Sequence, residues 1–97
     1  MAEEPVKQIH DAMASKEIPQ IYFNGFAMSV STGDIILLAQ RNGESAYIIN
    51  LSYTVAKTLA ERLTNIVAVL EKGAGQPILT TDQVKKCLED TPSGLDE

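Results

Sequence analysis

The sequence has few of the side chains that carry chemistry. Its 97 residues contain no tryptophan, one cysteine and one histidine. Because Cys87 has no second cysteine to pair with, an intramolecular disulfide is ruled out, as is usual in a reducing compartment. His10 has neither a second histidine nor a paired cysteine, so an exposed helix histidine is a better interpretation than a metal ligand. No histidine base stands at a motif spacing from Cys87, which favours a buried or inert thiol. The sequence therefore predicts no metal, no cofactor and no catalytic residue.

Long hydrophobic runs are also missing. The longest apolar segment, Ile35–Ala39, is far too short to span a bilayer. The first residues, MAEEPVKQIHDAM, are acidic and lack the apolar stretch of a secretory signal. These features predict a cytoplasmic protein that does not bind a membrane.

Basic residues are scarce. The chain has 8 of them against 13 acidic residues, which gives a net charge of −5. Nucleic-acid binding depends on lysine and arginine to neutralise phosphates, and Arg41 is the only basic residue between Ile18 and Tyr53. We therefore expect no nucleic-acid partner. The aromatic residues of that stretch are interpreted as core or interface rather than as platforms for bases: Tyr22, Phe23, Phe26 and Tyr47.

What the sequence does contain is the pattern of an antiparallel β-meander. Bulky β-favouring residues predict a first strand over Ile21–Val30 and a second over Ile35–Arg41. Asn42-Gly43 is the strongest hairpin signal in the chain and predicts a type I′ turn into a third strand, Glu44–Leu51. Three short strands joined by tight turns make a small antiparallel sheet.

After Ser52, which is a plausible N-cap, the hydrophobic period changes from 2 to 3.6. This change predicts one long amphipathic helix that ends at Gly73. Thr80 and Gln83 then form the pattern of a capping box, which predicts a short second helix to about Leu88. The apolar arc of the long helix consists of Val55, Ala56, Leu59, Ala60, Leu63, Ile66, Val67 and Leu70.

These elements predict one small domain of the α+β class. Its organisation is a flexible N-terminal segment over 1–19 with room for a short helix, and a core of meander plus long helix over 20–73. A linker with the short helix follows over 74–89, and an acidic tail over 90–97 is expected to be disordered.

Both faces of the predicted hairpin look apolar. A two-residue turn at Asn42-Gly43 places Arg41 opposite Glu44, and regular pairing beyond it would put Ala39 opposite Ala46, with Leu37 opposite Ile48 and Ile35 opposite Asn50. The other face would then pair Leu38 with Tyr47 and Ile36 with Ile49. A two-residue turn at Thr32-Gly33 would add Phe26, Met28 and Val30 to the first face.

One helix can cover only one face of such a sheet, so the second face is interpreted as an assembly surface between copies of the chain. The short terminal helices are the alternative cover. The residues expected at the oligomer interface are Ile35, Ile36, Leu37, Leu38, Tyr47, Ile48 and Ile49.

Two stretches carry a resemblance. IYFNGFAMSVSTGDIILL followed by INLSYTVAKTLAERLTNIVAVLEK resembles a family of small bacterial proteins of unknown function, over about Ile21 to Lys72. In that family a meander that opens with Ile-Tyr-x-Asn precedes a helix rich in leucine and alanine, and no activity or site is implied. The layout is also distantly similar to that of SecB-type export chaperones, a likeness of shape only.

The function expected from these features is that of a non-enzymatic, homo-oligomeric binding or adaptor protein whose partners are itself and another protein. One alternative is a sequestering or inhibitory protein, encoded by a mobile element, that holds a small ligand or a basic partner between protomers. A SecB-like chaperone is another alternative, and an enzyme with a site shared between subunits is the remaining hypothesis.

Overall fold

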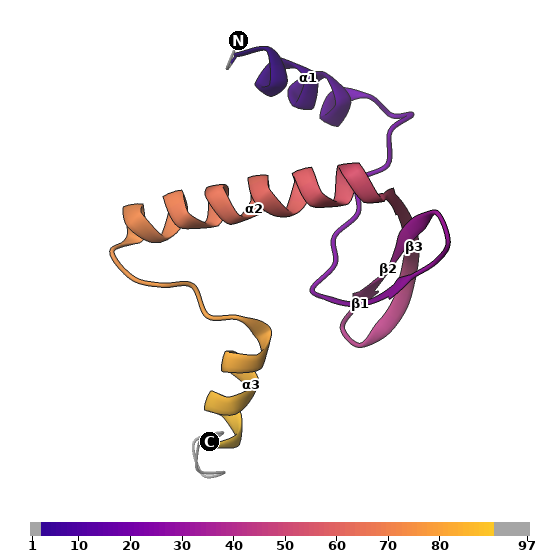
Figure 1. Cartoon of the computed structure of the whole chain (residues 1–97). Coiled ribbons are helices and arrows are strands. Elements are labelled where there is room, and N and C mark those ends of the chain that lie inside the picture. Colours follow the sequence, from indigo (N-terminus) through magenta and orange to yellow (C-terminus); the bar gives the residue numbers. More distant parts are fainter. Residues whose placement is uncertain (1–2, 91–97) are drawn as a thin grey trace. The chain divides into compact units, whose positions relative to one another are not determined.

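The structure is a computed structural model that describes residues 3–90 of the chain. Three helices and three strands follow one another along the sequence, and the predicted α+β class is confirmed. The chain divides into two compact units between Tyr53 and Thr54, and each unit is described by itself. The elements are α1 (Glu3–Ala14), β1 (Gly25–Val30), β2 (Asp34–Arg41), β3 (Glu44–Ser52), α2 (Tyr53–Ala74) and α3 (Thr81–Glu89) (Figure 1).

The three strands form one antiparallel sheet in the order β1-β2-β3, which confirms the predicted meander. The first strand is shorter than expected, because it begins at Gly25 and not at Ile21. Asn24, the residue before it, makes hydrogen bonds near the β2–β3 turn with both its backbone and its side chain. Its N–H donates to the carbonyl oxygen of Gln40 at 3.1 Å.

The hairpin turn at Asn42-Gly43 has the positive φ at both central residues that a type I′ turn requires, 54° and 86°. The side chain of Asn24, a residue outside the hairpin, makes two hydrogen bonds to this turn. Its Oδ1 accepts a hydrogen bond from the backbone N–H of Asn42 at 2.9 Å, and its Nδ2 donates to Asn42 Oδ1 at 3.0 Å. Asn24, which directly precedes β1, therefore stabilises the turn between β2 and β3.

The turn between β1 and β2 is also the predicted two-residue turn. Ser31 N–H donates to the carbonyl oxygen of Asp34 at 2.8 Å across Thr32-Gly33. The pairing of β1 with β2 then has no register shift and extends from Val30 opposite Ile35 to Gly25 opposite Gln40.

The predicted register between β2 and β3 is wrong beyond the first two pairs. Arg41 does lie opposite Glu44, but a β-bulge follows next to Gln40, and Ala46 is the extra residue of β3. As a result, Ala39 lies opposite Tyr47, Leu37 opposite Ile49, and Ile35 opposite Leu51. Because side chains alternate between faces, this shift of one residue moves every later side chain of β3 to the other face.

The two faces of the sheet consequently differ more than the sequence suggested. We call them the apolar face and the mixed face. The apolar face carries Phe26, Met28, Val30, Ile35, Leu37, Ala39, Tyr47, Ile49 and Leu51. The mixed face carries Ala27, Ser29, Ile36, Leu38, Gln40, Ile48 and Asn50.

Helix α2 begins at Tyr53, directly after Ser52 as predicted, and has 22 residues. Its end differs from the prediction, because the left-handed glycine that follows the helix is Gly75, with φ of 73°, and not Gly73. Gln76 N–H donates to the carbonyl oxygen of Glu71, and Gly75 N–H donates to those of Glu71 and Lys72, as in a Schellman ending. In the other unit, the hydroxyl of Tyr53 donates to the carbonyl oxygen of Ser31 in the β1–β2 turn.

The terminal helices are short. The N-terminal segment over 1–19, where the sequence left room for a short helix, contains α1 from Glu3 to Ala14. The capping box of α3 is confirmed, since Thr80 accepts from Gln83 N–H at 3.2 Å and Gln83 Oε1 accepts from Thr80 N–H at 2.9 Å. Residues 91–97 of the predicted acidic tail lie outside the described residues.

The core within this single chain is very small. Among residues 5–90, only Leu37 and Ala39 are buried. Both lie on the apolar face, in the central strand. No residue of α2 or α3 is buried, so the apolar arc of α2 is not enclosed as a protein core would be.

Candidate interaction surface

The apolar face is the most continuous apolar surface of the sheet. Every second residue of β1 and β2 contributes a side chain to it. Because of the bulge, Tyr47, Ile49 and Leu51 of β3 lie on the same face. Burial falls from the centre outward, since Leu37 is 9% exposed on β2 whereas Phe26 is 54% exposed on the neighbouring strand. The charged residues in register with this face, Arg41 and Glu44, lie opposite each other at its end, beside the Asn42-Gly43 turn. The apolar face is therefore a surface suited to an apolar partner.

Strand β1 is where this face is most exposed. Met28 is 58% and Val30 is 74% exposed, against an intermediate exposure for Ile35, Ile49 and Leu51 on the other two strands. The strand lies at an edge of the sheet, where only β2 pairs with it among the described residues.

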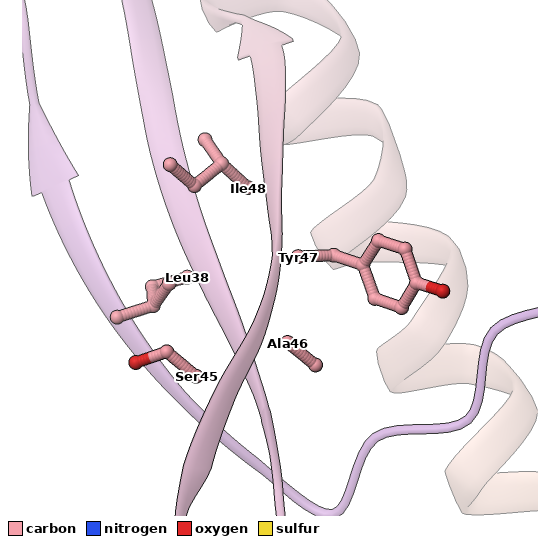
Figure 2. Close-up of a pocket in the computed structure, with 5 residues that line it drawn as sticks. All are labelled: Leu38, Ser45, Ala46, Tyr47 and Ile48. Carbon is pink, nitrogen blue, oxygen red and sulfur yellow. The ribbon is translucent and has the colours of Figure 1, made fainter.

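A hollow of about 370 Å³ lies along β3 beside the bulge. Figure 2 shows Leu38, Ser45 and Ile48 directed to one side of the sheet and Tyr47 to the other. Ala46 lies on the same side as Tyr47, as expected for the extra residue of a bulge (Figure 2). The hollow is open, and Ser45 directs its hydroxyl to the same side as the apolar groups of Leu38 and Ile48 (Figure 2). Such a site can accept a small apolar group, but it offers no set of convergent polar groups.

Helix α2 carries the second apolar surface, which belongs to the other unit. Ala56, Leu59, Leu63, Ile66 and Leu70 follow one another at spacings of three and four residues, the pattern of a helix that packs on other helices or on a sheet. Leu59, Leu63, Ile66 and Leu70 are all exposed. A hollow of about 240 Å³ lies on this helix and is lined by Asn65, Ile66, Val69 and Leu70.

The structure divides the expected interface residues between the two faces differently from the predicted register. Ile35, Leu37, Tyr47 and Ile49 share the apolar face, whereas Ile36, Leu38 and Ile48 share the mixed face. The predicted grouping of Leu37 with Ile48, and of Leu38 with Tyr47, is wrong because of the bulge at Ala46.

Sequence reasoning placed Phe26, Met28 and Val30 on a sheet face but did not count them as interface residues. The signal was present in the sequence, because Phe-Ala-Met-Ser-Val alternates large apolar and small residues at period 2. What the sequence did not reveal is that this strand would be the most exposed part of the sheet.

The single histidine and the single cysteine belong to different units. His10 lies on α1 and Cys87 on α3, and both are exposed, so the buried alternative for Cys87 is wrong. Within the described residues, no group of three or more His, Cys, Asp or Glu side chains could hold a metal ion.

No helix in the described part of the chain is both long enough and apolar enough to cross a membrane. Comparison of the chain with protein-family models, with curated proteins and with solved structures found no match in any of the three.

Proposed function

We propose that the protein is a non-enzymatic, homo-oligomeric binding or adaptor protein that acts through protein–protein contacts in the cytoplasm. The observation that carries the proposal is the apolar face. It presents nine apolar side chains, with charged residues in register only beside the β2–β3 turn, and only Leu37 and Ala39 among the nine are buried.

The free energy of burial supports an assembly. A large apolar side chain gains about 1.5–3 kcal/mol when it is removed from water. The apolar face has Phe26, Met28, Val30 and Tyr47 more than one third exposed, so covering these four would contribute several kcal/mol. A second copy of the chain is the simplest cover, because a two-fold axis uses the same surface twice.

The charge of the chain indicates the class of the other partner. A net charge of −5 disfavours nucleic acid and favours a protein with a basic or neutral surface. In this proposal the sheet holds the copies together, and the exposed polar sides of the helices are available for the other protein.

The test is the mass of the purified full chain by light scattering, followed by recovery of bound proteins from cells. We expect at least twice the 10.5 kDa mass of one chain. A folded monomer at micromolar concentration would contradict the oligomeric part of the proposal.

The hollow beside the bulge favours a second candidate function, that of a sequestering protein which holds a small ligand between protomers. Its volume of about 370 Å³ lies within the range of ligand sites. Native mass spectrometry of protein purified from cells is the test, since a retained ligand would add a defined mass to the oligomer. A ligand-free oligomer with no response in calorimetric screens would leave the adaptor function.

A further inference from the structure

The two edges of the sheet are not equally protected against pairing with another strand. Strand β3 carries a β-bulge at Ala46, a device that disrupts pairing along an edge. Strand β1, Gly25–Val30, has neither a bulge nor a charged residue nor a proline. It is also the strand whose apolar side chains are most exposed.

The direction of the β1 peptide groups follows from the turn. Ser31 N–H donates to the carbonyl oxygen of Asp34, so Ser31 belongs to a hydrogen-bonded pair with β2. Because such pairs alternate along an antiparallel ladder, Ser29 and Ala27 also face β2 with their peptide groups. The N–H and C=O groups of Phe26, Met28 and Val30 therefore point away from β2, toward the open edge.

On this basis, and resting on the proposed homo-oligomeric function, we infer that β1 pairs antiparallel with β1 of a second copy across a two-fold axis at Met28. In this register Met28 lies opposite Met28 of the second copy, and Phe26 lies opposite Val30. Only outward peptide groups then meet outward peptide groups, which forms about six backbone hydrogen bonds.

The side chains fit this register as well. Phe26 opposite Val30 is an aromatic and β-branched pair, a favourable cross-strand combination that occurs twice by symmetry. On the mixed face, Ala27 lies opposite Ser29, and both are small. No charge is brought near a like charge, because β1 contains none.

The consequence is one continuous six-stranded sheet. A two-fold axis that pairs two edges in antiparallel fashion stands perpendicular to the sheet, so the apolar faces of both copies lie on the same side. The seam brings Phe26, Met28 and Val30 of the two copies beside one another, which buries part of their exposed surface, whereas the rest of the combined apolar face is not covered by this contact.

Cysteine cross-linking tests the seam. In a full chain with Cys87→Ser, we expect Met28→Cys to form a disulfide-linked dimer under mild oxidation, because the Cα atoms of such a pair lie about 5.5 Å apart, within disulfide range. Ile48→Cys on β3 is the matched control, since Ile48 is 67% exposed against 58% for Met28. We expect at least ten times less dimer from the control at equal times.

Three outcomes are distinguished. Equal or faster linking at Ile48 overturns the β1 seam and leaves the homo-oligomer in place. A monomeric wild-type protein by light scattering overturns the seam and the proposed assembly together. Met28→Pro, which removes only an outward N–H, is expected to give a monomer with an unchanged circular dichroism spectrum, and a Met28→Pro variant that stays a folded dimer contradicts the inference.

Discussion

Gly43 is the residue whose backbone most restricts substitution. Its φ of 86° is unfavourable for any side chain with a Cβ. Gly33 has no such φ, and a Cβ added there would meet open space. We expect Gly43→Val to lower the free energy of unfolding by about 1–2 kcal/mol. Urea unfolding measures the change, and Gly33→Val is the control that should cost less. Equal losses would show that the turn is not held in the left-handed region.

Asn24 makes a second residue-scale prediction. Its side chain accepts from Asn42 N–H and donates to Asn42 Oδ1, so Asn24→Ala removes two hydrogen bonds at an exposed turn. At about 0.5–1.5 kcal/mol for each bond, we expect a loss of about 1–2 kcal/mol in urea unfolding. Asn24→Asp keeps the acceptor and should fall between wild type and alanine. A neutral Asn24→Ala would mean that the hairpin closes without this clamp.

At the scale of elements, α3 depends on its capping box. Thr80→Ala removes the hydroxyl that accepts from Gln83 N–H. Loss of such a cap costs about 0.5–2 kcal/mol of helix stability. Amide hydrogen exchange of α3 should therefore accelerate by about five-fold or more, whereas Thr81→Ala, inside the helix, should have a smaller effect. Unchanged exchange after Thr80→Ala would contradict the role of the cap.

Helix α2 carries the next element-scale prediction. Leu63 lies in the middle of its apolar arc, and we expect that arc to be buried in the assembled protein. Leu63→Ala should then lower the free energy of unfolding by about 2–5 kcal/mol, as cavity-forming substitutions do. The control is Glu61→Ala, on the polar side of the same helix. A similar, small effect of both changes would show that the arc remains in water.

The elements themselves could be predicted because their signals are local. The Asn42-Gly43 turn, the Thr80 capping box and the periodic arc of α2 each depend on residues a few positions apart. The register of β3 could not be predicted, because a bulge at Ala46 leaves no local signature in the residues Glu-Ser-Ala-Tyr. One unpaired residue was enough to exchange the faces of Tyr47 and Ile48.

The candidate interface was affected by the same error. The expected residues are all on strands β2 and β3, but the bulge divides them between two faces. The edge position and exposure of β1 come from the sheet order and from burial, which depend on the whole unit and not on any short pattern. The sequence therefore predicted an apolar sheet surface on β2 and β3, which stays a prediction, and it did not indicate the exposed edge strand β1.

At the scale of the whole molecule, the account depends on assembly. Among residues 5–90 only Leu37 and Ala39 are buried, so neither unit by itself encloses a sizeable core. A charge in the middle of the apolar face should therefore be poorly tolerated. We expect Leu37→Lys to give monomeric or insoluble protein, and the exposed Glu61→Lys on α2 to leave the oligomer intact.

The central claim is that copies of this chain assemble through the sheet, and the molar mass of the wild-type chain tests it most directly. Size-exclusion chromatography with light scattering, at micromolar concentration and moderate salt, should give at least twice the 10.5 kDa mass of one chain across the whole peak. A homogeneous peak at 10.5 kDa, with native secondary structure and a cooperative unfolding transition, would contradict the account.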